Sequence, residues 1–160
     1  MYLDKAELSG TYVSFGGGTG VFCFIDFVAF VLRYMCNKIC VSQFNEMGNT
    51  INSEDFSMVK DNFNLIYFST FADDESAVFH EICEELQELD KKYNLNVFKF
   101  YSRISSGDKI RWDKNFVVEK LGKLEEIKKI FICGPTRFLD DIKKSILESE
   151  IVGIEKIHLV

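Results

Sequence analysis

The chain reads Ser14-Phe15-Gly16-Gly17-Gly18-Thr19-Gly20-Val21-Phe22 near its start, where an apolar, aromatic segment passes through a glycine cluster into a long apolar stretch. This change of composition predicts a strand, a tight turn and a helix. Glycine lets the backbone adopt positive φ and approach a ligand closely, and the N–H groups at the start of a helix attract an anion. The stretch therefore predicts a turn that holds a diphosphate, and a plain glycine turn is the alternative.

The glycine cluster does not complete the dinucleotide fingerprint G-x-G-x-x-G/A. Gly16 and Gly18 fit its first two positions, but the third small position is Val21. The fingerprint alone is therefore a weak indication of nucleotide binding.

Length, composition and charge favour one globular domain spanning residues 1–160. The chain has 160 residues, of which 47% are hydrophobic, and this is enough for a proper core. Its formal net charge is -6 and its lysines and arginines are scattered. No basic patch for nucleic acid or for an anionic membrane is therefore expected.

The cysteines indicate a reducing, cytoplasmic setting. Their number is odd, five, and no C-x-x-C pair occurs; they are Cys23, Cys36, Cys40, Cys83 and Cys133. This pattern is typical of reduced, unpaired thiols. The cytosolic face of a membrane-anchored parent protein would provide the same reducing environment. Only two histidines are present and neither lies near Cys36 and Cys40 in the sequence, so no metal site is expected.

The apolar segment 21–35 predicts a buried helix. It is shorter than the roughly 20 residues needed to span a bilayer, and it contains Asp26 and Arg33. No membrane span is expected in this chain.

Strand and helix patterns alternate along the sequence. Aromatic and β-branched residues predict strands over 11–15, 64–69, 96–102, 129–133 and 156–160. Apolar spacing predicts helices over 77–93 and 138–147, with a short helix over 116–121. The alternation predicts an α/β fold: a three-layer, doubly wound sheet of about five parallel strands in the order 3-2-1-4-5. The polar stretch 41–62 is expected to be a surface insertion in the first crossover.

A second strand-to-helix junction follows the fourth expected strand. It reads Cys133-Gly134-Pro135-Thr136-Arg137-Phe138, in which Gly134 permits a sharp turn and Pro135 suits the start of a helix. The first and fourth strands are neighbours at the switch point of such a sheet, so both glycine turns should border one crevice. Cys133 is then either a packed core thiol or a group placed against a cofactor ring.

Gly17-Gly18-Thr19-Gly20 before an apolar helix, Cys133-Gly134-Pro135 before the last helix, and the terminal segment 156–160 resemble the NAD(P)-binding domain of the ferredoxin-NADP reductase superfamily. The pattern is most similar to NADH-cytochrome b-type reductases, and the resemblance covers nearly the whole chain. It implies that the first turn surrounds the pyrophosphate and the nicotinamide end. It also implies that Cys133 lies close to the hydride-bearing carbon, with Gly134 and Pro135 shaping the opposite wall. Cys23 stands where the family often has proline.

The resemblance also places the adenosine ribose at the end of the second strand, near Ser69, Asp73 and Asp74. Carboxylates there would accept hydrogen bonds from the ribose 2′-hydroxyl and repel a 2′-phosphate, so NADH is expected to be preferred, with NADPH possible. The alternative is that these acids only favour the N-terminus of the next helix.

An upstream barrel binds FAD in that family, and only about ten residues precede the first expected strand here. The resemblance therefore implies the C-terminal fragment, or one subunit, of a larger flavin reductase. Its partners would be an FAD-binding domain and an electron-acceptor protein or domain. The isolated chain would be inactive without the flavin. The alternative is a non-catalytic nucleotide-sensing or protein-interaction module on the same fold.

Three other features are expected to be mainly structural. Trp112 either stacks on adenine or anchors a long loop to the sheet. Arg137 either reaches a phosphate or forms a surface salt bridge. The phenylalanines at 22, 24 and 27 are expected in the core.

Overall fold

The computed structural model describes residues 8–46, 56, 58–104, 112–124 and 126–160. They form one parallel sheet in the order β3-β2-β1-β4-β5, as the sequence predicts. The strands are β1 (Thr11–Gly17), β2 (Asn64–Phe71), β3 (Phe98–Ile104), β4 (Ile127–Cys133) and β5 (Ile157–Leu159). The α-helices are α1 (Ile25–Glu46), α2 (His80–Tyr93), α3 (Lys114–Leu121) and α4 (Thr136–Ser149), with 3₁₀ helices η1 (Gly18–Phe24) and η3 (Ile154–Lys156).

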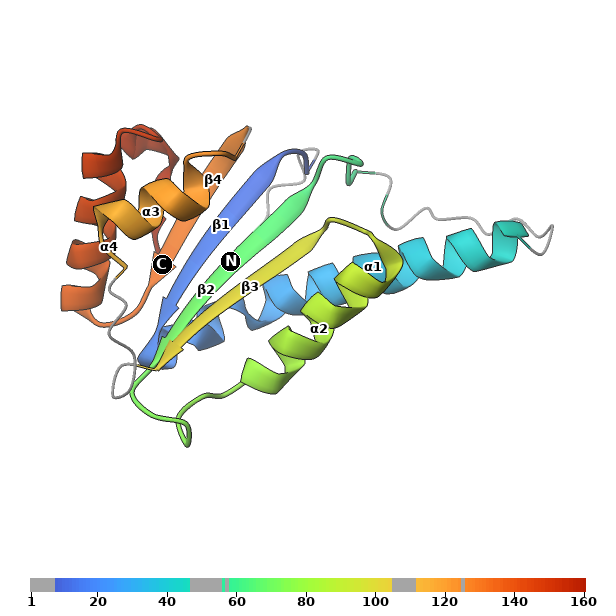
Figure 1. Cartoon of the computed structure of the whole chain (residues 1–160), viewed down its shortest axis with the longest axis horizontal. Helices are drawn as coiled ribbons and strands as arrows, with labels where there is room; N and C mark the ends of the chain where they lie inside the picture. Colours follow the sequence, from blue (N-terminus) through green and yellow to red (C-terminus); the bar gives the residue numbers. More distant parts are fainter. Residues whose placement is uncertain (1–7, 47–55, 57, 105–111, 125) are drawn as a thin grey trace.

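Two hydrophobic clusters sandwich the sheet, because alternate residues of each strand point to opposite faces. Tyr12 and Phe131 join the cluster with α1 and α2, and Phe15 and Ile132 join the cluster with α3 and α4. Figure 1 shows the two helix layers on opposite sides of the strands. The predicted three-layer architecture is confirmed.

The first crossover differs from the prediction at both of its ends. The glycine turn leads into the 3₁₀ helix η1, and the α-helix begins only at Ile25. The helix then continues through Glu46, since no glycine or proline interrupts residues 25–46. Residues 41–46 of the predicted polar insertion are therefore helical rather than loop, and residues 47–55 and 57 lie outside the described part.

Phe56 belongs to the same predicted insertion, yet it packs inward. Its ring lies 5.9 Å from that of Phe30 and 5.6 Å from that of Tyr34. These contacts add Phe56 to the hydrophobic cluster on the α1 side of the sheet. This part of the segment is thus attached to the helix layer.

The helical stretch Gly18–Gln43 is long and apolar enough to cross a membrane by length and composition. This stretch is longer than the predicted helix 21–35, so its length does not exclude a membrane span. Phe27, Val31 and Met35 form a fully buried stripe on this helix, while 39% of its most apolar window is buried in all. The absence of a membrane span stays a prediction.

A buried carboxylate joins α2 to β3. Asp90 Oδ1 accepts hydrogen bonds from the backbone N–H groups of Val97 (2.7 Å) and Phe98 (3.0 Å). These donors lie at the start of β3, and leaving them unpaired in the interior would be costly. Asp90 thereby positions the strand whose far end contributes to the site described below.

Candidate functional site: two glycine turns and a cavity

The two glycine turns lie side by side at the carboxyl edge of the sheet. β1 pairs in parallel with β4, and Gly16 stands opposite Cys133 in the register. A Cβ atom at Gly20 would overlap the backbone carbonyl of Cys133, so only glycine allows η1 to pack this closely on the end of β4. The two turns are therefore neighbours, as the strand order predicts, while the crevice expected between them stays a prediction.

Phe138, in the first turn of α4, occupies the space that side chains at the glycines would need. A Cβ at Gly17 would lie 2.8 Å from Phe138 Cδ1, and a Cβ at Gly134 would lie 2.7 Å from the same atom. The aromatic ring therefore packs between the two turns, and the missing side chains are what make room for it.

Gly18 and Thr19 form the exposed top of the first turn. Gly18 has a φ of +53°, in the left-handed region, and a Cβ there would meet no atom within 4 Å. Thr19 is also exposed. The backbone at this point thus faces open space, as a turn that cradles a phosphate requires.

The Cys133 side chain lies on the α1 side of the sheet and is only 7% exposed. Its thiol donates a hydrogen bond to Cys23 Sγ at 3.0 Å. Burial and this hydrogen bond raise the pKa of the Cys133 thiol, so it is protonated near neutral pH. Cys133 is therefore not suited to act as the first nucleophile on a substrate.

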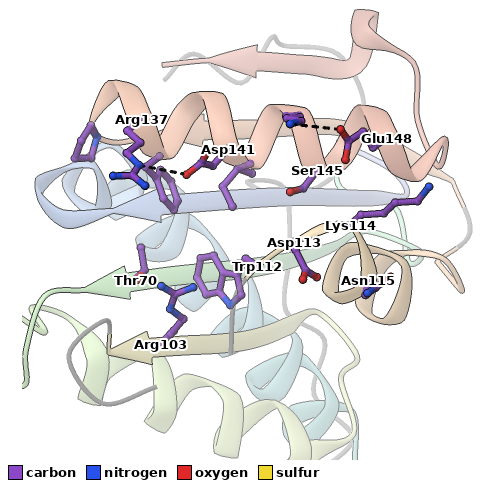
Figure 2. A pocket seen from close by; sticks show the side chains of 14 residues that line it. Thr70, Arg103, Trp112, Asp113, Lys114, Asn115, Arg137, Asp141, Ser145 and Glu148 are labelled. Atoms are coloured by element: carbon purple, nitrogen blue, oxygen red, sulfur yellow. Dashed lines mark ion pairs between the residues drawn. The ribbon is translucent and has the colours of Figure 1, made fainter. Parts of the chain in front are cut away.

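A cavity of about 950 Å³ opens beside the turns on the opposite face of the sheet. Thr70 at the end of β2, Arg103 at the end of β3, and Trp112 form one wall, and Pro135 and Arg137 belong to the other. Figure 2 shows Thr70, Arg103 and Trp112 across the cavity from Arg137 and Asp141 of α4, and the lining continues between α3 and α4.

The charges lining the cavity are mixed, and most have a partner. Arg137 Nε lies 3.9 Å from Asp141 Oδ2, and Lys144 Nζ lies 3.8 Å from Glu148 Oε1. Arg103 differs: its Nε is buried and has no hydrogen-bond partner among the described residues, while its guanidinium lies 6.0 Å from the centre of the Trp112 ring. A buried guanidinium donor without an acceptor favours an anionic or polar ligand at this point.

Three residues predicted at the ribose do not reach this cavity. Ser69 is fully buried in β2, and Asp73 and Asp74 lie in the exposed turn beyond the strand. The Asp73 carboxylate accepts a hydrogen bond from Ser76 N at 2.9 Å, so it stabilises its own turn. Because α2 begins only at His80, these acids do not occupy its first turn either.

Sequence reasoning missed Thr70 and Arg103 as residues of the cavity wall. Both follow from the strand alternation: Thr70 is the neighbour of Ser69 on the other face of β2, and it pairs with Arg103 in the β2–β3 register. Adjacent strand residues point to opposite faces of the sheet, so an error of one residue in the position of the strand end assigns a side chain to the wrong face.

Trp112 anchors its segment to the sheet, as one of the two interpretations predicts. Its ring centre lies 5.9 Å from that of Phe15, 5.7 Å from that of Phe68, and 5.7 Å from that of Phe116. The side chain is 7% exposed and still belongs to the cavity wall. The prediction that Phe22 is a core residue is wrong: it is 48% exposed, whereas Phe24 and Phe27 are buried.

A second, smaller cavity lies at the amino edge of the sheet. It measures about 550 Å³ and is lined by residues that include Gly10, Asn64 and Asn96. Neither glycine turn contributes to it. Within the part of the chain that the structure describes, no three His, Cys, Asp or Glu side chains are grouped to hold a metal ion.

Neither a protein-family model nor a curated protein matches this sequence. Solved structures match it strongly in fold. A flavohemoglobin from Malassezia yamatoensis with bound FAD and heme is similar with a TM-score of 0.61 and 16% identity, over 99% of this chain and 33% of that one. The CS–b5R domains of human Ncb5or in the NAD+ form are similar with a TM-score of 0.58 and 14% identity, over 96% of this chain and 37% of that one. Ferredoxin-NADP+ reductase from Plasmodium falciparum with 2′P-AMP is similar with a TM-score of 0.55 and 13% identity. The match covers 94% of this chain and 52% of that one.

These similarities confirm the resemblance to the reductase superfamily at the level of fold. The chain spans about a third to a half of the length of these proteins.

Proposed function

We propose that this chain is the pyridine-nucleotide-binding domain of an FAD-dependent oxidoreductase, positioning NADH or NADPH for hydride transfer to a flavin held by another domain. The observation that carries the proposal is the contact between the Gly17–Gly20 turn and the Cys133–Pro135 turn, next to a cavity where Arg103 Nε has no hydrogen-bond partner in the described part of the chain. Ligands of open parallel sheets bind at such a switch point.

The residues present fit a dinucleotide in three parts. The exposed backbone of Gly18 and Thr19 would hold the pyrophosphate, since no side chain covers it. Thr70, Arg103 and Trp112 would bind the adenosine half in the cavity. The nicotinamide half would then cross the Gly20–Cys133 contact towards the α1 side, past Gly134 and Pro135.

When bound, the reduced nicotinamide supplies a hydride to the flavin. The task of this chain is to place and orient the ring. Cys133 fits that task as a neutral, packed thiol: its burial on the α1 side fixes the end of β4 against η1. Ser69 is fully buried in β2 and would not touch the ligand.

The proposed partners follow from the length of the matched part. The flavohemoglobin and the reductases named above are two to three times as long as the region matched here. We expect the flavin on a separate FAD-binding domain, an electron-acceptor protein or domain as the final partner, and a cytoplasmic location.

Trp112 provides a direct test, because it is the chain's single tryptophan and lines the cavity. Titrating NADH into the protein should quench Trp112 emission saturably. Arg103→Gln should weaken binding by about tenfold, the equivalent of about 1.4 kcal/mol, since a charge-assisted hydrogen bond is lost. Lys99→Gln, an exposed change at the amino end of the same strand, should leave the affinity unchanged.

Absence of saturable quenching in the folded protein would contradict the proposal, as would equal effects of the two substitutions. A parallel titration with NADPH tests the nucleotide preference. NADPH binding more tightly than NADH would show that the acid-rich turn at Asp73 and Asp74 does not repel the 2′-phosphate.

A further inference from the structure

Two thiols from segments far apart in the sequence meet where η1 packs against the end of β4. Cys23 lies in η1 and Cys133 ends β4, and their Sγ atoms are 3.0 Å apart. Both thiols are free in this structure. A disulfide bond has an S–S length of about 2.05 Å, so an approach of roughly 1 Å would join them.

The backbone holds this pair together independently of the thiols. Gly20 packs directly on the Cys133 carbonyl, so the 3₁₀ turn that carries Cys23 cannot move away from β4 without separating the two glycine turns. The fold itself therefore keeps Cys23 and Cys133 close together, and forming a disulfide between them would cost little further chain entropy.

The two sulfurs differ in access. Cys23 is exposed, whereas Cys133 is buried beneath it, so an oxidant from solvent meets Cys23 first. This division of roles is that of an attacked cysteine and a resolving cysteine.

We propose that Cys23 and Cys133 form a reversible disulfide when the protein meets a hydroperoxide. The Cys23 thiolate attacks the peroxide oxygen, the O–O bond breaks, and a sulfenic acid and an alcohol or water form. Cys133 sulfur then attacks the Cys23 sulfur, expels hydroxide and releases its proton, which together make water. The two thiols are oxidised by two electrons and the peroxide is reduced by two.

The expected consequence is closure of the nicotinamide side, and this part rests on the proposed function. The new bond would tie η1 to the end of β4 where the ring is placed. The Cys23 side chain, which is exposed in the reduced protein, could then no longer move aside to make room for a bound nicotinamide ring. The disulfide itself does not depend on any nucleotide, so its formation is tested separately.

The first experiment treats the full chain with hydrogen peroxide, alkylates the remaining thiols, and maps linked peptides by mass spectrometry. The number of free thiols should fall from five to three, with the Cys23 peptide joined to the Cys133 peptide, and dithiothreitol should restore all five. Cys36→Ser, an exposed cysteine on α1, should keep the linkage, and Cys23→Ser should lose it. A Cys36–Cys40 link instead, or a sulfinic acid at Cys23 with Cys133 still alkylated, would overturn the proposal.

The second experiment measures NADH affinity before and after peroxide. Affinity should fall at least tenfold in the wild type and in Cys36→Ser, and dithiothreitol should reverse the loss. Unchanged affinity in the disulfide-linked protein would overturn the closure of the site. No NADH binding by the reduced protein would instead refute the proposed function, while the thiol count would still decide whether the pair is oxidised.

Discussion

Replacing Gly20 with alanine is expected to lower the free energy of unfolding by about 3 kcal/mol or more and to abolish nucleotide binding. The reason is steric: the added methyl would overlap the backbone carbonyl of Cys133, which no side-chain rotation can relieve. Either η1 lifts away from β4 or the end of β4 shifts. Urea unfolding followed by circular dichroism measures the stability, and the NADH titration measures the binding.

Gly18→Ala is the matched control, two residues earlier in the same turn. A Cβ at Gly18 would meet open space, so the only cost is the left-handed φ of +53°. That cost is about 1–2 kcal/mol for a residue other than glycine. If Gly20→Ala were no more destabilising than Gly18→Ala, the close packing of the two turns would be wrong.

Trp112→Ala is expected to destabilise the protein by about 3–5 kcal/mol, the range for removing a buried aromatic side chain. The ring contacts Phe15, Phe68 and Phe116, so its loss opens a cavity in the cluster beneath α3 and α4. It also removes a wall of the proposed adenosine pocket. Thermal and urea unfolding measure the first effect, and calorimetric titration with NADH measures the second.

Phe22→Ala is the control for this prediction. Phe22 is 48% exposed, and the change should cost less than about 1 kcal/mol. Trp112→Phe should restore most of the stability, since an aromatic ring still fills the space between Phe15 and Phe116. Equal destabilisation by Phe22→Ala and Trp112→Ala would contradict the assignment of which aromatic side chain is part of the core.

The strand order and the two turns could be predicted because their signals are local. Each strand is a short aromatic and β-branched run, and the glycines of the first turn and the Gly134–Pro135 pair mark strand-to-helix junctions. Right-handed parallel crossovers then leave few ways to arrange five strands. The adjacency of β1 and β4 follows from that topology, and with it the meeting of the turns.

The composition of the cavity wall could not be predicted in the same way. Ser69 and Thr70 are adjacent in the sequence, yet Ser69 points into the core and Thr70 into the cavity. Likewise, Phe22 and Phe24 are both apolar, but the 3₁₀ geometry of η1 turns Phe22 outwards. A periodicity of 3.6 residues does not apply there, since three residues complete each turn of a 3₁₀ helix.

The acid-rich turn shows a third limit. Asp73 was expected to meet a ribose or a helix N-terminus, and it instead accepts a hydrogen bond from Ser76 N within its own turn. Aspartate side chains commonly bond to nearby backbone in this way. Such a local partner competes with a ligand, and the sequence alone does not show which of the two the carboxylate contacts.

Mapping amide chemical shifts in the 18.5 kDa chain during addition of NAD+ tests the central claim most directly, because it reports where the nucleotide lies. Nucleotide binding at the carboxyl edge of the sheet predicts that the shifts concentrate in 17–20, 133–137, Thr70 and Arg103. Shifts gathered instead around Gly10, Asn64 and Asn96, at the amino-edge cavity, or no shifts at all in the folded protein, would contradict it.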